Sequence, residues 1–211
     1  MPKQSSGAAQ EEAAERIRKA AIALFKARGY HGTPVRALAS IVKIEAGSLY
    51  YHFPSKQEIL FDNFVRTMDA LIEGLQRASE SATEPQARVC AAVRFHVLFH
   101  VERQSEAVIS HTEIRSLTDQ NRQQIIVKRD LYERMFCDLL SAGVEAGVFR
   151  IPDIRLTAIA ILTMCSGVSD WFSADGRLSG DTVAEQYQAM ALRVVGYTGE
   201  FLARPQSGRL T

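Results

Sequence analysis

Residues 33–56 read TPVRALASIVKIEAGSLYYHFPSK, and this stretch decides the fold of the front of the chain. Apolar residues recur at the spacing of one helical face over 35–42 and again over 46–53. Thr33 is a good N-cap for the first of these helices, and Pro34 suits its first turn. Two short helices joined by a tight turn, behind a longer amphipathic helix, form a helix-turn-helix.

The outward face of the second short helix carries small residues and aromatic hydrogen-bonding residues, whereas a merely solvated face would carry Glu and Lys. These outward residues are Gly47, Ser48, Tyr51 and His52, with Tyr50 at the boundary. A small residue lets a helix approach base edges, and hydroxyl and imidazole groups bind phosphates. The helix pair is therefore predicted to read duplex DNA.

The charge distribution favours the same interpretation. Residues 15–60 contain eight Lys and Arg residues against three Asp and Glu residues, a net charge of +5. Residues 61–211 carry a net charge of −3, and the whole 211-residue chain carries +1. A basic N-terminal segment joined to a mildly acidic remainder of the chain indicates that the N-terminal segment binds a polyanion.

The runs TPVRALA at 33–39 and AGSLYYHFPSK at 46–56 resemble the TetR/AcrR family of bacterial transcriptional regulators, and the resemblance covers about residues 15–62. It implies an all-α dimer with a three-helix N-terminal DNA-binding domain and a larger C-terminal regulatory domain. The residues that it implies for phosphate binding are Thr33, Tyr50, Tyr51, His52 and Lys56. Those that it implies nearest to the bases are Arg36, Gly47 and Ser48.

The turn departs from the family pattern. The family commonly has A-G-V-S there, whereas this chain has Val42-Lys43-Ile44-Glu45, and the missing glycine makes the tight turn harder to form. Glu45 places an acid near the predicted DNA face. We expect it to favour the N-terminus of the second helix through the helix dipole and not to touch a base.

The rest of the chain is predicted to be helical, which gives an all-α fold of nine helices. The later helices are expected at about 56–77, 86–103, 105–118, 120–146, 153–173 and 180–199. The predicted domains are a flexible arm (1–14), the helix-turn-helix DNA-binding domain (15–60), a ligand-binding and dimerisation domain (61–203) and a C-terminal tail (204–211).

The helices expected at 153–173 and 180–199 carry extensive apolar surface. This surface belongs either to the interior core or to a dimer interface. The resemblance favours the interface, because TetR-like proteins usually dimerise through their last two long helices. Two-fold symmetry is also what a palindromic operator requires.

Aromatic residues in a bundle are more often core than pocket, yet an effector must bind between helices. The candidates for effector contact are Phe99, Arg115, Tyr132 and Trp171. The stretch HTEIRSL at 111–117 resembles a segment of TetR-type regulators of lipid catabolism that respond to acyl-coenzyme A thioesters. In that case Arg115 would bind an anionic effector; alternatively, it pairs with a neighbouring glutamate on a solvated helix.

Metal and disulfide chemistry are not expected. His96 and His100 stand four residues apart, but the spacing fixes no third ligand, so packing is the favoured interpretation. Cys90, Cys137 and Cys165 lie far apart within apolar helical patterns, which predicts core thiols and no zinc site. We expect no metal and no cofactor.

No catalytic motif of a hydrolase, a phosphate-binding loop or a metalloprotease occurs, so an enzyme is not predicted. The predicted function is a repressor that binds a palindromic DNA operator as a homodimer and is released by a small-molecule effector. Control by a protein partner is the alternative. The longest nearly apolar run, Leu156–Val168, is too short to span a bilayer, and no secretory signal is visible, so a cytoplasmic location without membrane contact is expected.

Overall fold

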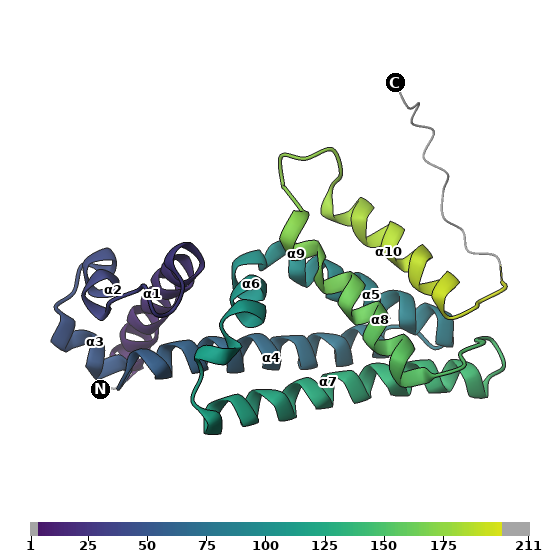
Figure 1. Ribbon diagram of the computed structural model, residues 1–211, viewed down its shortest axis with the longest axis horizontal. Coiled ribbons are helices and arrows are strands. Elements are labelled where there is room, and N and C mark those ends of the chain that lie inside the picture. Colours follow the sequence, from purple (N-terminus) through teal and green to yellow (C-terminus); the bar gives the residue numbers. More distant parts are fainter. Residues whose placement is uncertain (1–3, 200–211) are drawn as a thin grey trace. The chain divides into compact units, whose positions relative to one another are not determined.

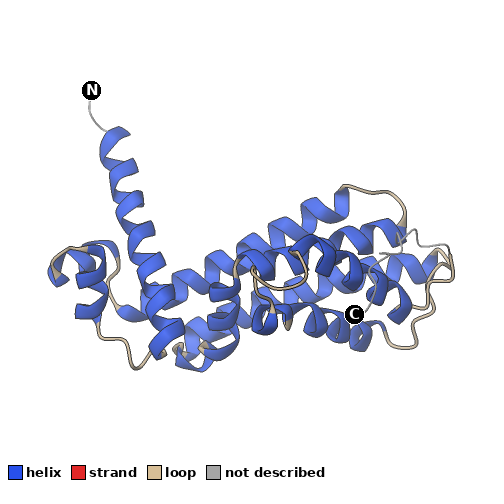
Figure 2. Ribbon diagram, turned by 90° about the horizontal axis from the view of Figure 1, so that it is seen from above, coloured by secondary structure: helices blue, strands red, loops and turns tan. Residues whose placement is uncertain are grey.

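The structure is a computed structural model that describes residues 4–199, with side chains from residue 10 onward. The helices of this part of the chain are α1 (Gln4–Arg28), α2 (Val35–Val42), α3 (Ala46–His52), α4 (Lys56–Glu80), α5 (Pro85–Glu102), α6 (Gln104–Thr112), the 3-10 helix η1 (Ile114–Ser116), α7 (Asp119–Glu145), α8 (Ile154–Ser166), α9 (Val168–Trp171) and α10 (Gly180–Val194) (Figure 1). Figure 2 shows only helices and loops over these residues, and the predicted all-α fold is confirmed. Over the same residues, no helix is both long enough and apolar enough to cross a membrane.

Local signals in the sequence set several helix ends. Gly29 and Gly147 adopt positive φ values of 70° and 71° directly after α1 and just after α7, which is the conformation that glycine favours at a helix C-terminus. At the start of α8, the Asp153 carboxylate accepts the Leu156 backbone N–H at 2.9 Å. The Ser179 hydroxyl oxygen caps α10 by accepting a backbone N–H in the same way.

Several boundaries differ from the sequence-based expectation. The helix expected at 105–118 ends at Thr112 and is followed by the short η1. α1 begins at Gln4 and not near Glu15, because the preceding residues are rich in Ala, Gln and Glu, which favour helices. The helix expected at 153–173 is interrupted at Gly167, where glycine has low helix propensity, and continues as α9. α10 ends at Val194 and not near 199, because Gly196 turns the chain with a φ of 65°.

The chain divides into two compact units. The first contains residues 1–70 and 103–129, and its buried residues include Ile17, Phe25, Leu38, Leu49 and Ile59. Within this unit α1 packs against α2, α3 and α6. The helix-turn-helix therefore shares a unit with α6 and η1, although these elements are far apart in sequence.

The second unit contains residues 71–102 and 130–211. Within it α5 packs along α10 and also contacts α8 and α9. Phe136, Leu140 and Ile161 are fully buried in its core. The predicted boundary between residues 60 and 61 follows chain order, whereas residues 103–129 belong to the first unit, so that boundary stays a prediction. The predicted C-terminal tail (204–211) lies outside the described residues.

Candidate nucleic-acid interface

The helix-turn-helix is formed by α2, α3 and the turn between them. Lys43 follows α2 in the left-handed conformation, with φ 57° and ψ 47°, and the next N–H, of Ile44, donates to the Ala39 carbonyl at 3.0 Å. Arg16 of α1 closes the same helix end, because its Nη2 donates to the Val42 carbonyl at 2.6 Å. A lysine thus occupies a position where glycine is usual.

The side chains of α3 divide between core and surface as the pattern predicts. Leu49 is fully buried and Phe53 is also buried, whereas Tyr50 is 50% exposed and Tyr51 is 74% exposed. His52 is half-buried and packs edge-on against Tyr51, with ring centroids 5.3 Å apart. An outward surface of two tyrosine hydroxyls therefore stands on a well-anchored helix.

Gly47 has no packing reason within the protein to be a glycine. A Cβ at this position would meet no heavy atom within 4 Å. Glycine inside a helix costs about 1 kcal/mol relative to alanine. Its presence beside the exposed Ser48 is explained if another molecule approaches this surface closely.

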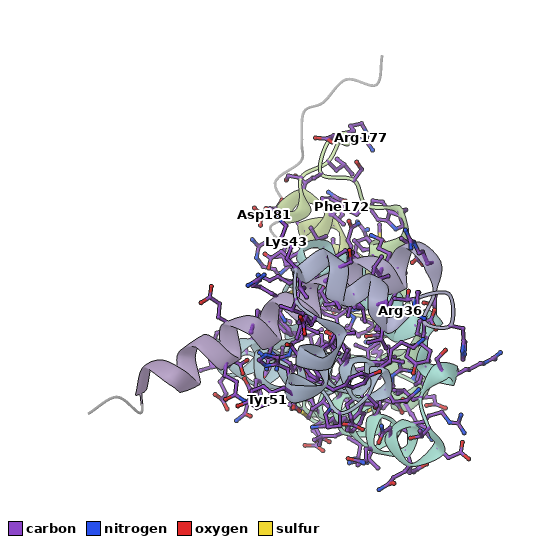
Figure 3. The ribbon with its side chains drawn as sticks, turned by 90° about the vertical axis from the view of Figure 1, so that its left-hand side faces the viewer. Arg36, Lys43, Tyr51, Phe172, Arg177 and Asp181 are labelled. Atoms are coloured by element: carbon purple, nitrogen blue, oxygen red, sulfur yellow. The ribbon has the colours of Figure 1, made fainter. Side chains whose placement is uncertain are left out.

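Exposed charged side chains lie on α2 and in the turn before α3. Arg36 on α2 and Lys43 in the turn are both exposed, and Figure 3, viewed from the end that carries α2 and α3, labels them with Tyr51. Glu45 is the N-cap residue of α3, and its side chain accepts no capping hydrogen bond. We therefore still predict that Glu45 stabilises α3 only through its charge, by the helix dipole.

Thr33 has an internal role in this structure. Its side chain is fully buried, and its hydroxyl donates to the carbonyls of Gly29 at 2.9 Å and Leu24 at 3.3 Å. The N-cap of α2 is Pro34, so the prediction that Thr33 caps this helix is wrong. The hydroxyl is turned back toward the end of α1, where the Gly29 carbonyl follows the last residue of the helix. It presents no exposed donor for the predicted phosphate contact.

Lys56 also bonds inside the protein. Its Nζ donates to the carbonyls of Tyr30 and Thr33, each at 2.9 Å, and lies 4.2 Å from the centroid of the Tyr30 ring. Burial lowers the pKa of the Lys56 ammonium. The first residue of α4 therefore ties the loop between α1 and α2 in place.

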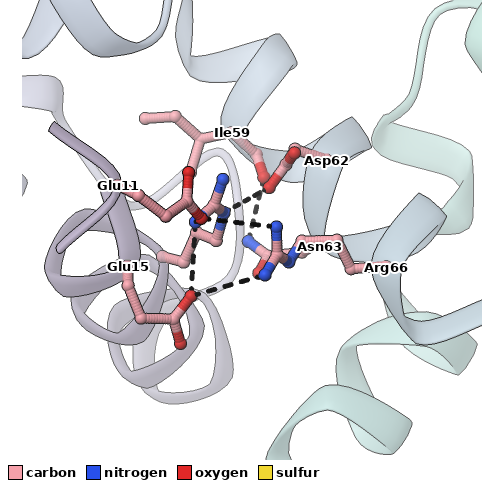
Figure 4. Close-up of polar contacts among 7 residues, drawn as sticks. Glu11, Glu15, Ile59, Asp62, Asn63 and Arg66 are labelled. Atoms are coloured by element: carbon pink, nitrogen blue, oxygen red, sulfur yellow. Dashed lines mark hydrogen bonds and ion pairs between the residues drawn. The ribbon is translucent and has the colours of Figure 1, made fainter. Parts of the chain in front are cut away.

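An ion-pair network links α1 to the start of α4 (Figure 4). Arg18 is nearly buried, with 9% of its side chain exposed, and its Nε donates to Asp62 at 2.6 Å. Its Nη1 contacts Glu11 at 2.8 Å and Glu15 at 3.2 Å, and Arg66 approaches Glu11 at 3.6 Å. Burial alone would lower the pKa of Arg18, but the hydrogen bonds and attraction of Asp62 and Glu11 raise it.

A cavity of about 310 Å³ opens beside this network, between α1, α4 and α6. It is lined by Glu15, Arg18, Ile22, Asn63, Arg66, Thr67, Arg103 and Glu106. Because the lining is mostly polar and of mixed charge, this cavity does not suit an acyl chain.

Residues of α6 and η1 bond directly to the loop that follows α1. The Tyr30 N–H donates to Glu113 Oε1 at 3.2 Å, and the Ser116 hydroxyl donates to Glu113 Oε2 at 2.7 Å. Gln57 of α4 donates to the Tyr30 hydroxyl oxygen at 3.0 Å and to the Ser116 carbonyl. A displacement of α6 or η1 would therefore be transmitted through these hydrogen bonds to the loop between α1 and α2.

The second unit holds a buried polar cluster around one of the predicted effector residues. The Tyr132 hydroxyl lies 2.7 Å from His96 Nδ1, and the Ser166 hydroxyl lies 3.0 Å from His96 Nε2. The His100 ring stacks on His96 at 4.3 Å and packs edge-on against the buried Phe99. Phe99 and Tyr132 thus belong to one neighbourhood, and burial raises the pKa of Tyr132.

The other two predicted effector residues lie elsewhere. Trp171 is 53% exposed at the end of α9, near Phe172. Arg115 belongs to the first unit, is exposed on η1 and forms no ion pair with any residue that the structure describes. The residues that the structure describes contain no cluster of three or more potential metal ligands, His96 and His100 included.

Comparison with known proteins identifies the family. A family model described as bacterial regulatory proteins of the tetR family matches residues 17–62, and one described as tetracyclin repressor-like, C-terminal domain matches residues 82–195. The chain belongs to the TetR family. Like the relatives that share its helix-turn-helix, this TetR-family chain is a transcriptional regulator and not an enzyme.

Individual TetR-family proteins are similar along most of the chain. The HTH-type transcriptional repressor KstR2 of Mycobacterium tuberculosis is 31% identical over 177 residues, which cover 82% of this chain and 87% of KstR2. A tetR-family regulatory protein from Rhodococcus RHA1 has a TM-score of 0.83 at 29% identity, covering 89% and 98% of the two chains. AibR, solved with isovaleryl coenzyme A and operator DNA, has a TM-score of 0.78 at 25% identity, covering 88% and 99%.

Two features of the site escaped the sequence analysis. The Arg18–Asp62 pair joins residues 44 positions apart, and its only sequence signal is an arginine directly beside the apolar stripe residue Ile17. The link from Glu113 to Tyr30 spans 83 positions and has no local signal. Both depend on tertiary packing of the first unit.

Proposed function

We propose that this TetR-family chain is a ligand-responsive repressor that binds a palindromic operator as a homodimer and is released by a small-molecule effector. The observation that carries this proposal is the outward surface of α3, where Gly47 and Ser48 lie beside the exposed Tyr50 and Tyr51. Small residues and hydroxyl groups on a short anchored helix suit close contact with a major groove.

Within this proposal, phosphates are bound by Tyr50, Tyr51, His52 and Lys56. Lys56 uses two of its three ammonium N–H groups inside the protein, so one remains for a phosphate. Bases are read by Arg36 and Ser48, and the Gly47 backbone lies against them. Thr33 supports this surface from inside.

The proposed homodimer uses α8 and α10. α8 exposes Leu156 (64%) and Ile159 (40%), and α10 exposes Met190 (40%) and Val194 (48%). Two copies of this apolar surface, related by a two-fold axis, would bury it. The dimer would then present two copies of α3 about one duplex turn apart, roughly 34–36 Å. Sedimentation at micromolar concentration is expected to give the mass of two chains.

The proposed effector is an acyl-coenzyme A or another metabolite of lipid catabolism. AibR, a structural relative of 25% identity, was solved with isovaleryl coenzyme A and operator DNA. Phe99, Tyr132 and Trp171, all in the second unit, are the proposed contacts to the effector, and Arg115, in the first unit, is a separate candidate to bind an anionic group. Release requires only that the effector prefer the DNA-free state by about 1–3 kcal/mol.

Fluorescence anisotropy with labelled duplexes tests the DNA-binding part. Tyr51→Phe is expected to weaken binding to every duplex by the same factor, about tenfold, because it removes one hydrogen bond to a charged group. Arg36→Ala is expected to change the preferred sequence, because it removes a contact to a base edge. Arg77→Ala, which removes an exposed cation of α4 in the second unit, is the control and should bind like the parent.

Two results would overturn this assignment. The parent chain binding no duplex at low ionic strength would refute the proposed operator binding. Arg36→Ala weakening all duplexes equally would refute its base contact. If DNA binding holds but no metabolite raises the melting temperature or releases the duplex, control by a protein partner replaces the effector.

A further inference from the structure

The first unit contains a partly buried cation that lacks an acid partner. Arg129 lies on α7, and its Nη2 donates to the carbonyl of Ser110 on α6 at 2.6 Å. Among the residues that the structure describes, no carboxylate lies within ion-pair distance of this guanidinium. Burial lowers the pKa of Arg129, and no acid offsets that effect.

Neighbouring cations are arranged differently. Lys128, the preceding residue, pairs with Asp69, and Arg122 on the same helix pairs with Asp119 at 2.6 Å. An unpaired charge held away from water is costly, which is why buried charges are normally paired. Arg129 therefore lacks the acid partner that these two cations of the same helix have.

The remaining donors of Arg129 are accessible to a ligand. A guanidinium has five N–H donors, and the Ser110 carbonyl uses one. Over the described part of the chain, the only fully buried side-chain polar atom without a partner is Oε1 of Gln86. The unbonded nitrogens of Arg129 therefore still reach the surface.

We propose that Arg129 binds the anionic group of the effector, a carboxylate or a phosphate. A planar guanidinium binds either group through two parallel hydrogen bonds, and the attraction is strong where water is partly excluded. This inference rests on the proposed effector response, and it adds Arg129 to Arg115 as a second cation for that group.

The position of Arg129 connects ligand binding to the DNA-binding elements. Its hydrogen-bond partner Ser110 lies on α6, three residues before Glu113, which accepts the Tyr30 N–H. The Tyr30 carbonyl in turn accepts a hydrogen bond from the Lys56 ammonium. An anion that draws Arg129 away from Ser110 would alter the end of α6 and, through these bonds, the loop before α2. All of these residues belong to the first unit.

The test uses the full chain and four probes: octanoate, coenzyme A, octanoyl-coenzyme A and the uncharged octanol. Affinity is measured by calorimetry for the parent, for Arg129→Gln and for Arg122→Gln. Glutamine keeps a polar side chain but removes the charge. Arg122→Gln is the matched control, because it removes another arginine of α7 in the same unit.

We expect at least one anionic probe to bind the parent and octanol to bind much more weakly. Arg129→Gln should weaken the anionic probe at least tenfold, while Arg122→Gln should keep the parent affinity. Binding of octanoate indicates a carboxylate site, and binding of coenzyme A indicates a phosphate site. Equal affinity in parent and Arg129→Gln, or no binding of any anionic probe to the parent, overturns the proposal.

A second measurement separates ligand binding from a structural role. Without probe, Arg129→Gln should melt no lower than the parent, because it relieves an unpaired buried charge. A melting temperature several degrees below the parent would mean that Arg129 only holds the end of α6, and the proposal would be wrong. Arg122→Gln should bind operator DNA like the parent. Failure of the parent to bind DNA would refute the proposed function and leave the probe results standing.

Discussion

Lys43 sits in the turn between α2 and α3, where its backbone angles coincide with the centre of the left-handed region. A residue with a Cβ pays roughly 1–2 kcal/mol for this conformation. Glycine does not, although its greater freedom in the unfolded chain offsets about 0.4–1 kcal/mol of that gain. Lys43→Gly is therefore expected to stabilise the protein by about 0.5–1 kcal/mol.

The comparison is made with variants that remove the same charge. Lys43→Ala keeps a Cβ and should be no more stable than the parent, and Lys43→Asn should fall between alanine and glycine because asparagine tolerates this conformation. For a chain of this size, 1 kcal/mol shifts the melting temperature by about 2–4 °C. Thermal unfolding followed by far-UV circular dichroism measures these differences.

The expected order is Gly, then Asn, then Ala. This order does not depend on the lysine charge, because all three variants lack it. A melting temperature of Lys43→Gly at or below that of Lys43→Ala would refute the reasoning. It would mean that the left-handed backbone conformation has no free-energy cost at this turn. The three variants also share any loss in DNA affinity, so a matching drop in all three would assign the Lys43 ammonium to a phosphate.

Two further changes follow from the same unit. Gly47→Ala should stabilise the protein by about 0.5–1 kcal/mol, because the added Cβ meets open space and alanine favours a helix. The same change should weaken operator binding, because the Cβ would keep the helix away from the bases. Unchanged binding in an anisotropy titration would show that nothing approaches this face closely. Asp62→Asn should lower the free energy of unfolding in urea by about 1–3 kcal/mol, because it removes the charged partner 2.6 Å from the nearly buried Arg18. Glu73→Gln, which breaks an exposed ion pair, is the control and should lower it by less than about 0.5 kcal/mol. Equal effects would show that the network contributes no more than a surface pair.

Most of the fold could be predicted because its determinants are local. Periodic apolar residues and capping residues act within one or two helical turns, and Gly29, Gly147, Asp153 and Ser179 end or begin helices as their chemistry requires. The start of α1 at Gln4 and the end of α10 before Gly196 were harder to predict. At both places the sequence permits a helix, and packing or a single glycine decides where the helix begins or ends.

The candidate site was only partly predictable because its positioning depends on distant partners. Exposure of Tyr50 and Tyr51 follows from the period of α3 alone. The internal bonds of Thr33 do not, because a threonine before a proline is equally suited to cap the next helix or to bond back to the last one. The acid-free setting of Arg129 depends on what α6 places opposite it, and no spacing along α7 reports that.

The run LYYHFPSK illustrates how one motif carries two kinds of information. Leu49 and Phe53 are core residues, Ser55 accepts the Glu58 N–H at 3.1 Å at the start of α4, and Lys56 bonds to two carbonyls of the preceding loop. These side chains hold the helix-turn-helix together whatever DNA sequence is bound. The two tyrosines face outward but offer hydroxyls suited to phosphates, which are the same on every duplex. A motif of this kind therefore identifies the family and orients the recognition helix. We propose that choice of operator then depends on Arg36 and Ser48, where a substitution would alter base contacts without disturbing the scaffold.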